Sequence, residues 1–222
     1  MLRREFLRRT AGTMGAAWLG QGVGRAGTFL EEQPALPQKF QAHDEVVLGK
    51  TGIRTSRLAM GTGTIGGGRQ SNQTRLGTNP FVKLLADGYN ENGLRFFDSA
   101  DSYGSHPYVK EALTKVPRDK VTVLTKTDTR YPAGVRQDLD RYKRELGVDY
   151  IDIVLVHCVT EADWTTRYRG VMDVLSEAKQ KGEIRAHGVS CHSPPSAEGC
   201  GGLAMGGGRP CAAKPDRVAH GC

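Results

Sequence analysis

Four residues of this chain carry the side chains that a proton-transfer site needs. Asp98, Tyr103, Lys126 and His157 supply a carboxylate, a phenol, an amine and an imidazole. Each lies at or just beyond the end of an apolar run that is typical of a buried strand. Polar groups at the carboxyl ends of successive parallel strands are how β/α barrels build active sites. We therefore expect these four side chains to meet.

The chemistry of such a set would centre on Tyr103. A phenol with its reference pKa near 10 is a poor acid or base at neutral pH. A neighbouring ammonium stabilises the phenolate, lowers that pKa and makes proton transfer usable. Lys126 suits this role, Asp98 would keep Lys126 charged, and His157 would orient an acceptor oxygen. Each residue alone also has an ordinary interpretation. Lys126 could be a surface lysine and Asp98 a loop cap. His157 could be a core histidine and Tyr103 a packing aromatic.

The elements that would position these residues alternate between strand and helix. Strands are expected at about 56–61, 94–98, 121–126, 150–156 and 184–190. Helices are expected between them, at about 80–92, 106–115, 134–146 and 166–181, because apolar residues recur there at helical spacing. Residues 46–53 indicate a hairpin with glycine turns. This order predicts a parallel α/β sheet with right-handed crossovers.

A glycine-rich segment, Gly61-Thr62-Gly63-Thr64-Ile65-Gly66, follows the first expected strand. It matches the G-x-G-x-x-G pattern of dinucleotide-binding folds. That fingerprint should open directly into a helix and be followed by an acidic strand end. Here a polar stretch continues to Pro80, which favours a flexible loop over the dinucleotide fingerprint.

Two motifs resemble the aldo-keto reductases. One is Phe96-Phe97-Asp98-Ser99-Ala100 with Tyr103-Gly104 downstream, which keeps the family's five-residue step from Asp to Tyr. The other is the opening Leu48-Gly49-Lys50-Thr51-Gly52. The resemblance runs from about Val46 to Ser193. The short-chain dehydrogenases also pair Tyr with Lys, but they need Tyr-x-x-x-Lys, and the chain has no such match.

This resemblance implies a TIM-type (β/α)8 barrel plugged by an N-terminal β-hairpin, of which the chain would hold about five of eight β/α units. It implies reduction of an aldehyde or ketone to an alcohol with NADPH or NADH. Asp98, Tyr103, Lys126 and His157 would be the catalytic tetrad, acting on a small-molecule carbonyl substrate. Gly61 and Thr62 would line the nicotinamide side of the pocket. Ser190 and Cys191 match a serine, usually followed by asparagine, that contacts the carboxamide in this family.

The two ends of the chain differ from its body. Residues 1–26 contain Arg3-Arg4 before a weakly apolar stretch, which resembles a twin-arginine signal peptide. This predicts export through the twin-arginine translocase to the periplasm. The alternative is a basic amphipathic helix on a cytoplasmic protein. Residues 27–43 are expected to be a linker.

The family-like region is expected at 44–193, followed by a low-complexity tail at 194–222. The tail has seven Gly, five Ala, four Pro and three Cys in 29 positions. It suits either an out-of-frame translation or a natural disordered tail. A barrel with five strands cannot close. We therefore expect weak or no activity from this chain, and the alternative function is a non-catalytic remnant or binding protein of the same fold.

Composition excludes several other classes. The net charge of +7 is spread along the chain without a basic block, so no nucleic-acid partner is expected. No apolar run is long enough for a stable membrane span. Cysteine and histidine residues, which can bind metals, cluster near the end of the chain. They lack the paired spacing of a zinc site, so no metal is expected. They are Cys191, His192, Cys200, Cys211 and His220.

Overall fold

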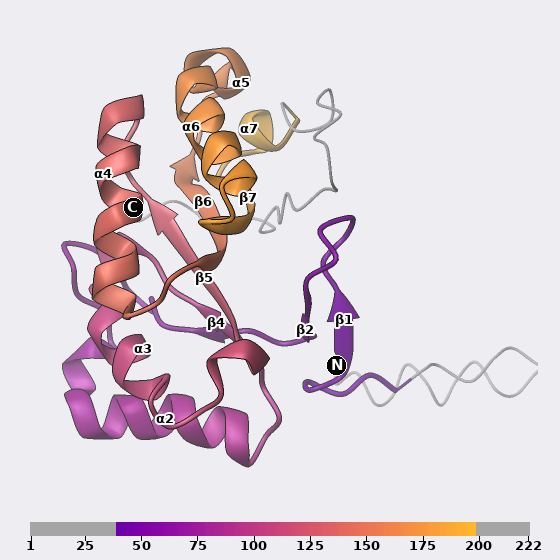
Figure 1. Ribbon diagram of the computed structural model, residues 1–222, viewed down its shortest axis with the longest axis vertical. Helices are drawn as coiled ribbons and strands as arrows, with labels where there is room; N and C mark the ends of the chain where they lie inside the picture. The colour runs from indigo at the N-terminus through magenta and orange to yellow at the C-terminus, as the bar shows by residue number, and fades with distance from the viewer. Residues whose placement is uncertain (1–38, 199–222) are drawn as a thin grey trace, which may run out of the picture. The chain divides into compact units, whose positions relative to one another are not determined.

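The computed structural model describes residues 39–198 (Figure 1). The predicted signal segment, most of the predicted linker and the tail from residue 199 lie outside the described residues. In the part that is described, no helix has both the length and the apolar character to cross a bilayer.

Five parallel strands form the sheet, and their spatial order is their order in the sequence. This confirms the predicted α/β class. Each strand after β3 is reached through a helical crossover, as parallel neighbours require. The strands are β3 (Met60–Gly61), β4 (Phe96–Asp98), β5 (Thr122–Thr127), β6 (Ile151–Val159) and β7 (Ile184–Cys191).

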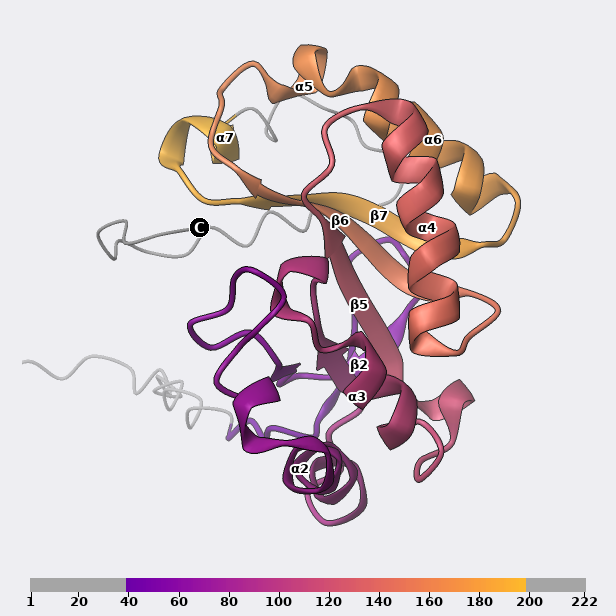
Figure 2. The same cartoon turned by 90° about the vertical axis from the view of Figure 1, so that its left-hand side faces the viewer.

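Four longer helices connect the strands and cover one face of the sheet. They are α2 (Thr78–Asn90), α3 (His106–Ala112), α4 (Pro132–Leu146) and α6 (Arg169–Gln180), with a short α5 (Trp164–Arg167) before the last. Consecutive helices pack against one another, and Figure 2 shows α4 and α6 side by side. α4 begins with Pro132 at its first turn and ends at Gly147, which takes the left-handed conformation (φ 66°) that favours glycine.

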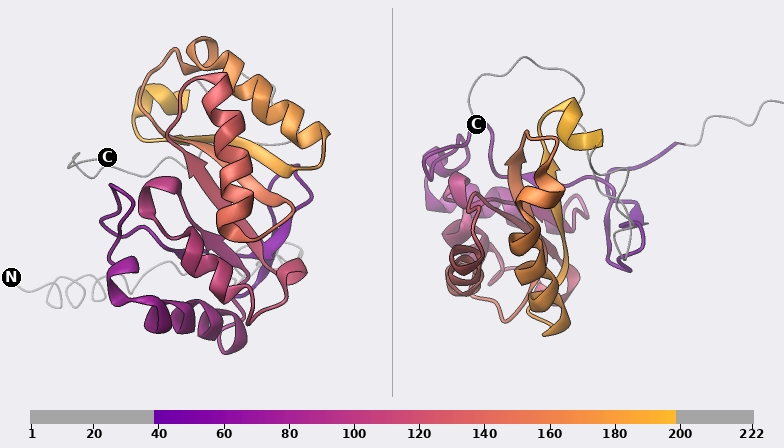
Figure 3. Two further views of the ribbon diagram at one scale, coloured as in Figure 1. Left: turned by 60° about the vertical axis from the view of Figure 1, so that its left-hand side comes forward. Right: turned by 90° about the horizontal axis from the view of Figure 1, so that it is seen from above.

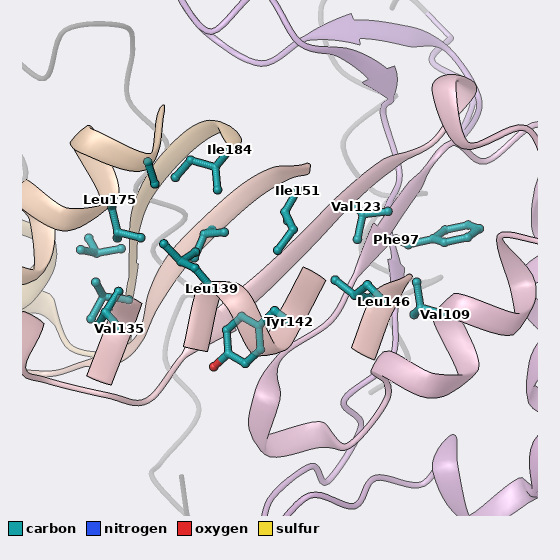
Figure 4. Packing of buried hydrophobic residues seen from close by; sticks show 14 of the residues in the cluster. Phe97, Val109, Val123, Val135, Leu139, Tyr142, Leu146, Ile151, Leu175 and Ile184 are labelled. Atoms are coloured by element: carbon teal, nitrogen blue, oxygen red, sulfur yellow. The ribbon is translucent and has the colours of Figure 1, made fainter. Parts of the chain in front are cut away.

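The main hydrophobic core lies between these helices and the sheet. Val123 and Val154 from the strands are fully buried there, as are Leu139 and Leu146 from α4. Figure 4 shows side chains from the strands and from α4 meeting in this layer. Burial of such residues is the main force that holds helices on a sheet.

A second, smaller core occupies the opposite face of the sheet. Leu124, Ile153 and Ala186 alternate with the residues of the main core and pack against Ile53. Ile53 lies in the hairpin of β1 (Glu45–Val47) and β2 (Arg54–Ser56), which pair antiparallel as predicted. The hairpin therefore lies on the other side of the sheet from the helices (Figures 1 and 3).

The strand register brings the predicted site residues to one face. Asp98 pairs with Leu124, and Lys126 pairs with Leu155. Lys126 is two residues beyond Leu124, and His157 is two residues beyond Leu155. Because side chains two residues apart share a face, all three site residues lie on the face of the smaller core, at the carboxyl ends of their strands.

Three boundaries differ from the sequence prediction. The first barrel strand is only Met60–Gly61, because residue 56 belongs to the hairpin. β6 continues to Val159, past the expected end at residue 156. Pro194–Glu198, the first residues of the expected low-complexity tail, forms a short helix, α7.

Local capping explains why α7 forms. The Ser193 hydroxyl accepts a hydrogen bond from the Ser196 amide at 3.2 Å, and the Ser193 amide donates to the Ser196 hydroxyl at 3.3 Å. This reciprocal pair is a capping box, and Pro194 suits the first helical position. The Trp164 indole donates to the Ser196 carbonyl at 3.0 Å, which fixes α7 to the body.

Candidate active site

Asp98 and Lys126 form an ion pair at the carboxyl ends of β4 and β5. Lys126 belongs to a strand that is buried along its whole length, and its side chain is only 8% exposed. Its ammonium also donates to the Ser99 carbonyl at 2.9 Å. Two acceptors thus hold the charged form of Lys126 in place, which a buried ammonium requires.

A single tight turn places Tyr103 beside this pair. Ser99 donates from both its amide and its hydroxyl to the Leu124 carbonyl, at 2.8 and 2.7 Å. A 3₁₀ turn over Asp101–Tyr103 follows and ends at Gly104 in the left-handed conformation. The Lys126 ammonium lies 5.0 Å from the centre of the Tyr103 ring. The five-residue step from Asp98 to Tyr103 therefore spans Ser99, Ala100 and this turn.

The glycine-rich loop packs directly against the Tyr103 ring. A Cβ atom at Gly63 would lie 2.2 Å from that ring, and one at Gly66 would lie 2.6 Å from it. A Cβ atom at Gly61 would meet nothing within 4 Å. Gly63 and Gly66 thus leave the space that the Tyr103 ring occupies. No helix opens from this motif, which agrees with the loop prediction.

His157 completes the predicted cluster from β6. Its Nε2 lies 3.3 Å from the Tyr103 hydroxyl, and the two rings meet edge to face with centroids 5.5 Å apart. The His157 carbonyl accepts a hydrogen bond from Arg130. The structure therefore brings together all four residues that the sequence singled out.

Asp128 is a member of the site that the sequence analysis missed. Its carboxylate lies 3.0 Å from Nδ1 of His157, and the Ser102 hydroxyl lies 3.4 Å from the same nitrogen. Burial raises the pKa of Asp128, but the hydrogen bonds of His157 and Ser102 and the charges of His157 and Arg130 together outweigh it, so the pKa lies below its usual value. Asp128 lies two residues beyond Lys126, so the alternation of the strand was the signal that could have revealed it.

The four predicted cofactor residues differ in their surroundings. Ser190 lies near the end of β7 with its hydroxyl 2.9 Å from Nε2 of His192. Thr62 is buried, and its hydroxyl contacts the Asp98 carbonyl and the Ser105 hydroxyl. The Cys191 thiol is buried too and donates to the Ser196 carbonyl of α7 at 3.4 Å. Gly61 and Ser190 are thus available to a ligand, whereas Thr62 and Cys191 are turned into the fold.

This arrangement can carry a proton to an oxygen atom bound near Tyr103. A phenol, an ammonium and an imidazole converge there. The carboxylate of Asp98 pairs with the ammonium, and that of Asp128 contacts the imidazole. Several proton donors that face the same position can stabilise negative charge as it develops on a substrate oxygen.

Similarity to known proteins identifies the family of this chain. The model of the aldo/keto reductase family matches residues 57–207, which extends past the expected limit at Ser193. The NADH-specific methylglyoxal reductase of Escherichia coli K12 is 29% identical over 169 residues, covering 66% of this chain and 51% of that protein. The chain spans about half the length of the curated relatives it matches.

Solved structures agree on the fold. An aldo-keto reductase of Pseudomonas aeruginosa superposes with a TM-score of 0.59 at 24% identity, covering 75% of this chain and 66% of that one. An aldo-keto reductase of Bombyx mori, solved with NADP, gives 0.53 at 24% identity, covering 68% and 51%. The described strands therefore correspond to part of the family's (β/α)8 barrel. With the family model matching more than half of its length, this chain belongs to the aldo/keto reductase family.

Proposed function

We propose that this protein reduces an aldehyde or ketone to an alcohol with a reduced nicotinamide cofactor. The observation that carries the proposal is the convergence of Tyr103, Lys126, Asp98 and His157 at one sheet edge. The E. coli relative supports it, because that protein is an NADH-specific methylglyoxal reductase. A small 2-oxoaldehyde is therefore a reasonable probe substrate.

Tyr103 is the proton donor in this scheme. As hydride reaches the carbonyl carbon, negative charge grows on the oxygen, and the phenol delivers its proton there. The Lys126 ammonium stabilises the phenolate that remains. Asp98 is a positioning residue, because it holds Lys126 and does not itself meet the substrate.

His157 sets the position of the oxygen. An ionised carboxylate only accepts hydrogen bonds, so Nδ1 of His157 carries the ring proton and donates it in a hydrogen bond to Asp128. Nε2 is then the ring atom that faces Tyr103 and any oxygen bound beside it. Asp128 thereby fixes the ring orientation, as a carboxylate does for other catalytic histidines.

The described residues fit one end of a nicotinamide cofactor. Ser190 offers a hydroxyl for the carboxamide, and the open space at Gly61 lets a planar ring approach the backbone. When bound, NADPH or NADH supplies the hydride. The choice between them is part of the proposal, since NADH and NADP are named for different relatives.

Reduction of methylglyoxal by the 222-residue chain tests the proposal, with NADPH and NADH supplied in turn. We expect slow turnover that falls at least about 100-fold in Tyr103→Phe, the scale of a lost general acid. Equal rates for the two proteins would reject the assignment of Tyr103.

A second candidate is a non-catalytic protein of the same fold. It is favoured by the orientation of Cys191, whose thiol faces α7 and leaves Ser190 as the remaining contact for a carboxamide. A fluorescence titration with NADPH separates the candidates. A folded chain that binds neither nucleotide supports the second one, and saturable binding supports the reductase.

We also propose that the protein is exported by the twin-arginine translocase to the periplasm. The motif Arg3-Arg4 supports this proposal. The variant Arg3→Lys/Arg4→Lys should keep the protein in the cytoplasm of a Gram-negative host. An unchanged distribution of the variant between cytoplasm and periplasm would contradict it.

A further inference from the structure

Three potential metal ligands meet beside the proposed active site. The ligand atoms of His157, Cys158 and His192 all lie within 4.8 Å of one another. They come from the ends of the neighbouring strands β6 and β7. We propose that these three residues bind one divalent cation of the zinc class.

A bulge in β6 makes this grouping possible. Adjacent residues of a regular strand point to opposite faces. Here the register between β6 and β7 shifts between Val156 and Val159, and Cys158 has a positive φ of 48°. The bulge turns Cys158 so that its thiol reaches His192 while its neighbour His157 stays in the active site. Bulges next to active sites commonly re-aim side chains in this way.

The spacing suits tetrahedral coordination. The Cys158 sulfur lies 3.7 Å from Nδ1 of His192 and 3.9 Å from its Nε2. Zinc bonds of ~2.3 Å to sulfur and ~2.0 Å to nitrogen place such ligands about 3.5 Å apart. The rings of His157 and His192 have centroids 5.9 Å apart. His192 is exposed, so small rotations of its side chain can close the remaining gaps.

Both imidazoles already have the outer partners of metal ligands. Asp128 accepts a hydrogen bond from Nδ1–H of His157, which leaves Nε2 to coordinate. The Ser190 hydroxyl lies 2.9 Å from Nε2 of His192, which favours Nδ1 as the coordinating atom on the side of Cys158. A carboxylate or other acceptor behind each histidine is the usual second layer of a zinc site. Binding as thiolate releases the Cys158 proton to solvent.

A second group of potential ligands in the described residues is already neutralised. Asp101, His106 and Glu145 lie close together, but Arg69 and Arg141 pair with both carboxylates. Two guanidinium groups repel an incoming cation.

Metal binding would engage Nε2 of His157, the same atom that faces Tyr103. The cation should therefore inhibit carbonyl reduction, a consequence that rests on the proposed function. The site itself does not depend on that function, because occupancy can be measured without any turnover.

The test is a Co²⁺ titration of the full 222-residue chain, followed by Zn²⁺ competition against a chromophoric chelator. We expect one equivalent to bind with thiolate-to-cobalt charge-transfer absorption, and Zn²⁺ to displace it. Cys158→Ser should abolish that absorption and weaken Zn²⁺ binding at least about 10-fold. Asp128→Asn should weaken it about 10- to 100-fold, as loss of an outer partner does.

Cys191→Ser is the matched control, because its thiol faces the Ser196 carbonyl, which a serine hydroxyl can also reach. It should leave the absorption and the affinity unchanged. Far-UV circular dichroism checks that each variant is folded. The proposal is overturned if the chain binds no metal, or if folded Cys158→Ser keeps the charge-transfer band, which would place the thiolate elsewhere in the chain.

Discussion

Two carboxylates pair with cations at opposite ends of the same sheet, and their surroundings differ. Asp152, near the amino end of β6, is 1% exposed and accepts from the Val123 amide at 2.9 Å. It also pairs with Arg185 at 2.7 Å and Arg118 at 2.9 Å. Asp98, at the carboxyl end of β4, pairs with Lys126, and its side chain is 37% exposed.

The difference separates stability from chemistry. Asp152 ties three strands together with both of its oxygens engaged, as a buried carboxylate must be to avoid a large desolvation cost. Asp98 faces the open end where Tyr103 and His157 gather. In β/α barrels the carboxyl end is the functional end and the amino end serves stability. This chain follows that division within a few strands.

Asp152→Ala should give the largest effect on stability. It removes the shared acceptor and leaves a buried amide and two guanidinium groups without their partner. We expect a loss of about 3 kcal/mol in the free energy of unfolding, measured by urea denaturation, because breaking a buried pair costs that much. If Asp98→Ala destabilises the chain equally, the distinction between the two ends is wrong.

Lys126→Met should show the opposite pattern. Methionine fills a similar apolar volume, and the half-exposed Asp98 carboxylate can be hydrated. We expect the unfolding free energy to change by less than about 1 kcal/mol. Turnover of methylglyoxal should drop about 100-fold, because the phenolate loses its cation. A strongly unstable Lys126→Met would show that the pair serves mainly as a structural link.

Gly63→Ala should have an intermediate effect through the Tyr103 ring. The added Cβ would lie 2.2 Å from that ring, so Tyr103 must move. We expect about 10-fold slower turnover and a loss of about 1 kcal/mol in stability, the lower range for overpacking. Gly67→Ala in the same loop is the control, since its Cβ would meet nothing within 4 Å. Equal losses of turnover in both variants would argue against the idea that the glycine-rich loop positions the Tyr103 ring.

Acid should weaken a third polar cluster slightly. The hydrogen bond from His106 lowers the pKa of Glu145 to about 2. Because the folded-state pKa is depressed, this stabilisation is present above the reference value of 4.5 and is lost as pH falls toward 2. With solvent screening, the effect should be about 1 kcal/mol. Urea denaturation between pH 5 and pH 3 should show that the free energy of unfolding falls less steeply with pH in Glu145→Gln than in the native chain. An identical dependence on pH would contradict the stabilising role of ionised Glu145.

The sequence predicted the elements well because its apolar spacing is regular. The hairpin and the five strands were identified from periodicity and turn residues. The four site residues were identified from their positions at or just beyond strand ends and from the resemblance to the aldo-keto reductases. Asp98, Tyr103, Lys126 and His157 could be predicted because parallel strands bring their carboxyl ends together. Their catalytic roles remain predictions.

What the sequence did not predict depends on local backbone geometry. The bulge in β6 breaks the alternation that would send Cys158 away from His157, so the grouping with His192 was missed. The composition of the tail obscured the capping box at Ser193 and with it α7. The inward turns of Thr62 and Cys191 depend on contacts with distant residues that no local pattern records.

The central claim is that Tyr103 donates a proton to the carbonyl oxygen as hydride from the cofactor reaches the carbonyl carbon. The most direct measurement follows the label from NADPH or NADH deuterated at the transferable position into the alcohol formed from methylglyoxal. We predict one deuterium on the former carbonyl carbon with the native chain, and at least about 100-fold less with Tyr103→Phe. Equal labelling by the two proteins, or none with either, would contradict the account.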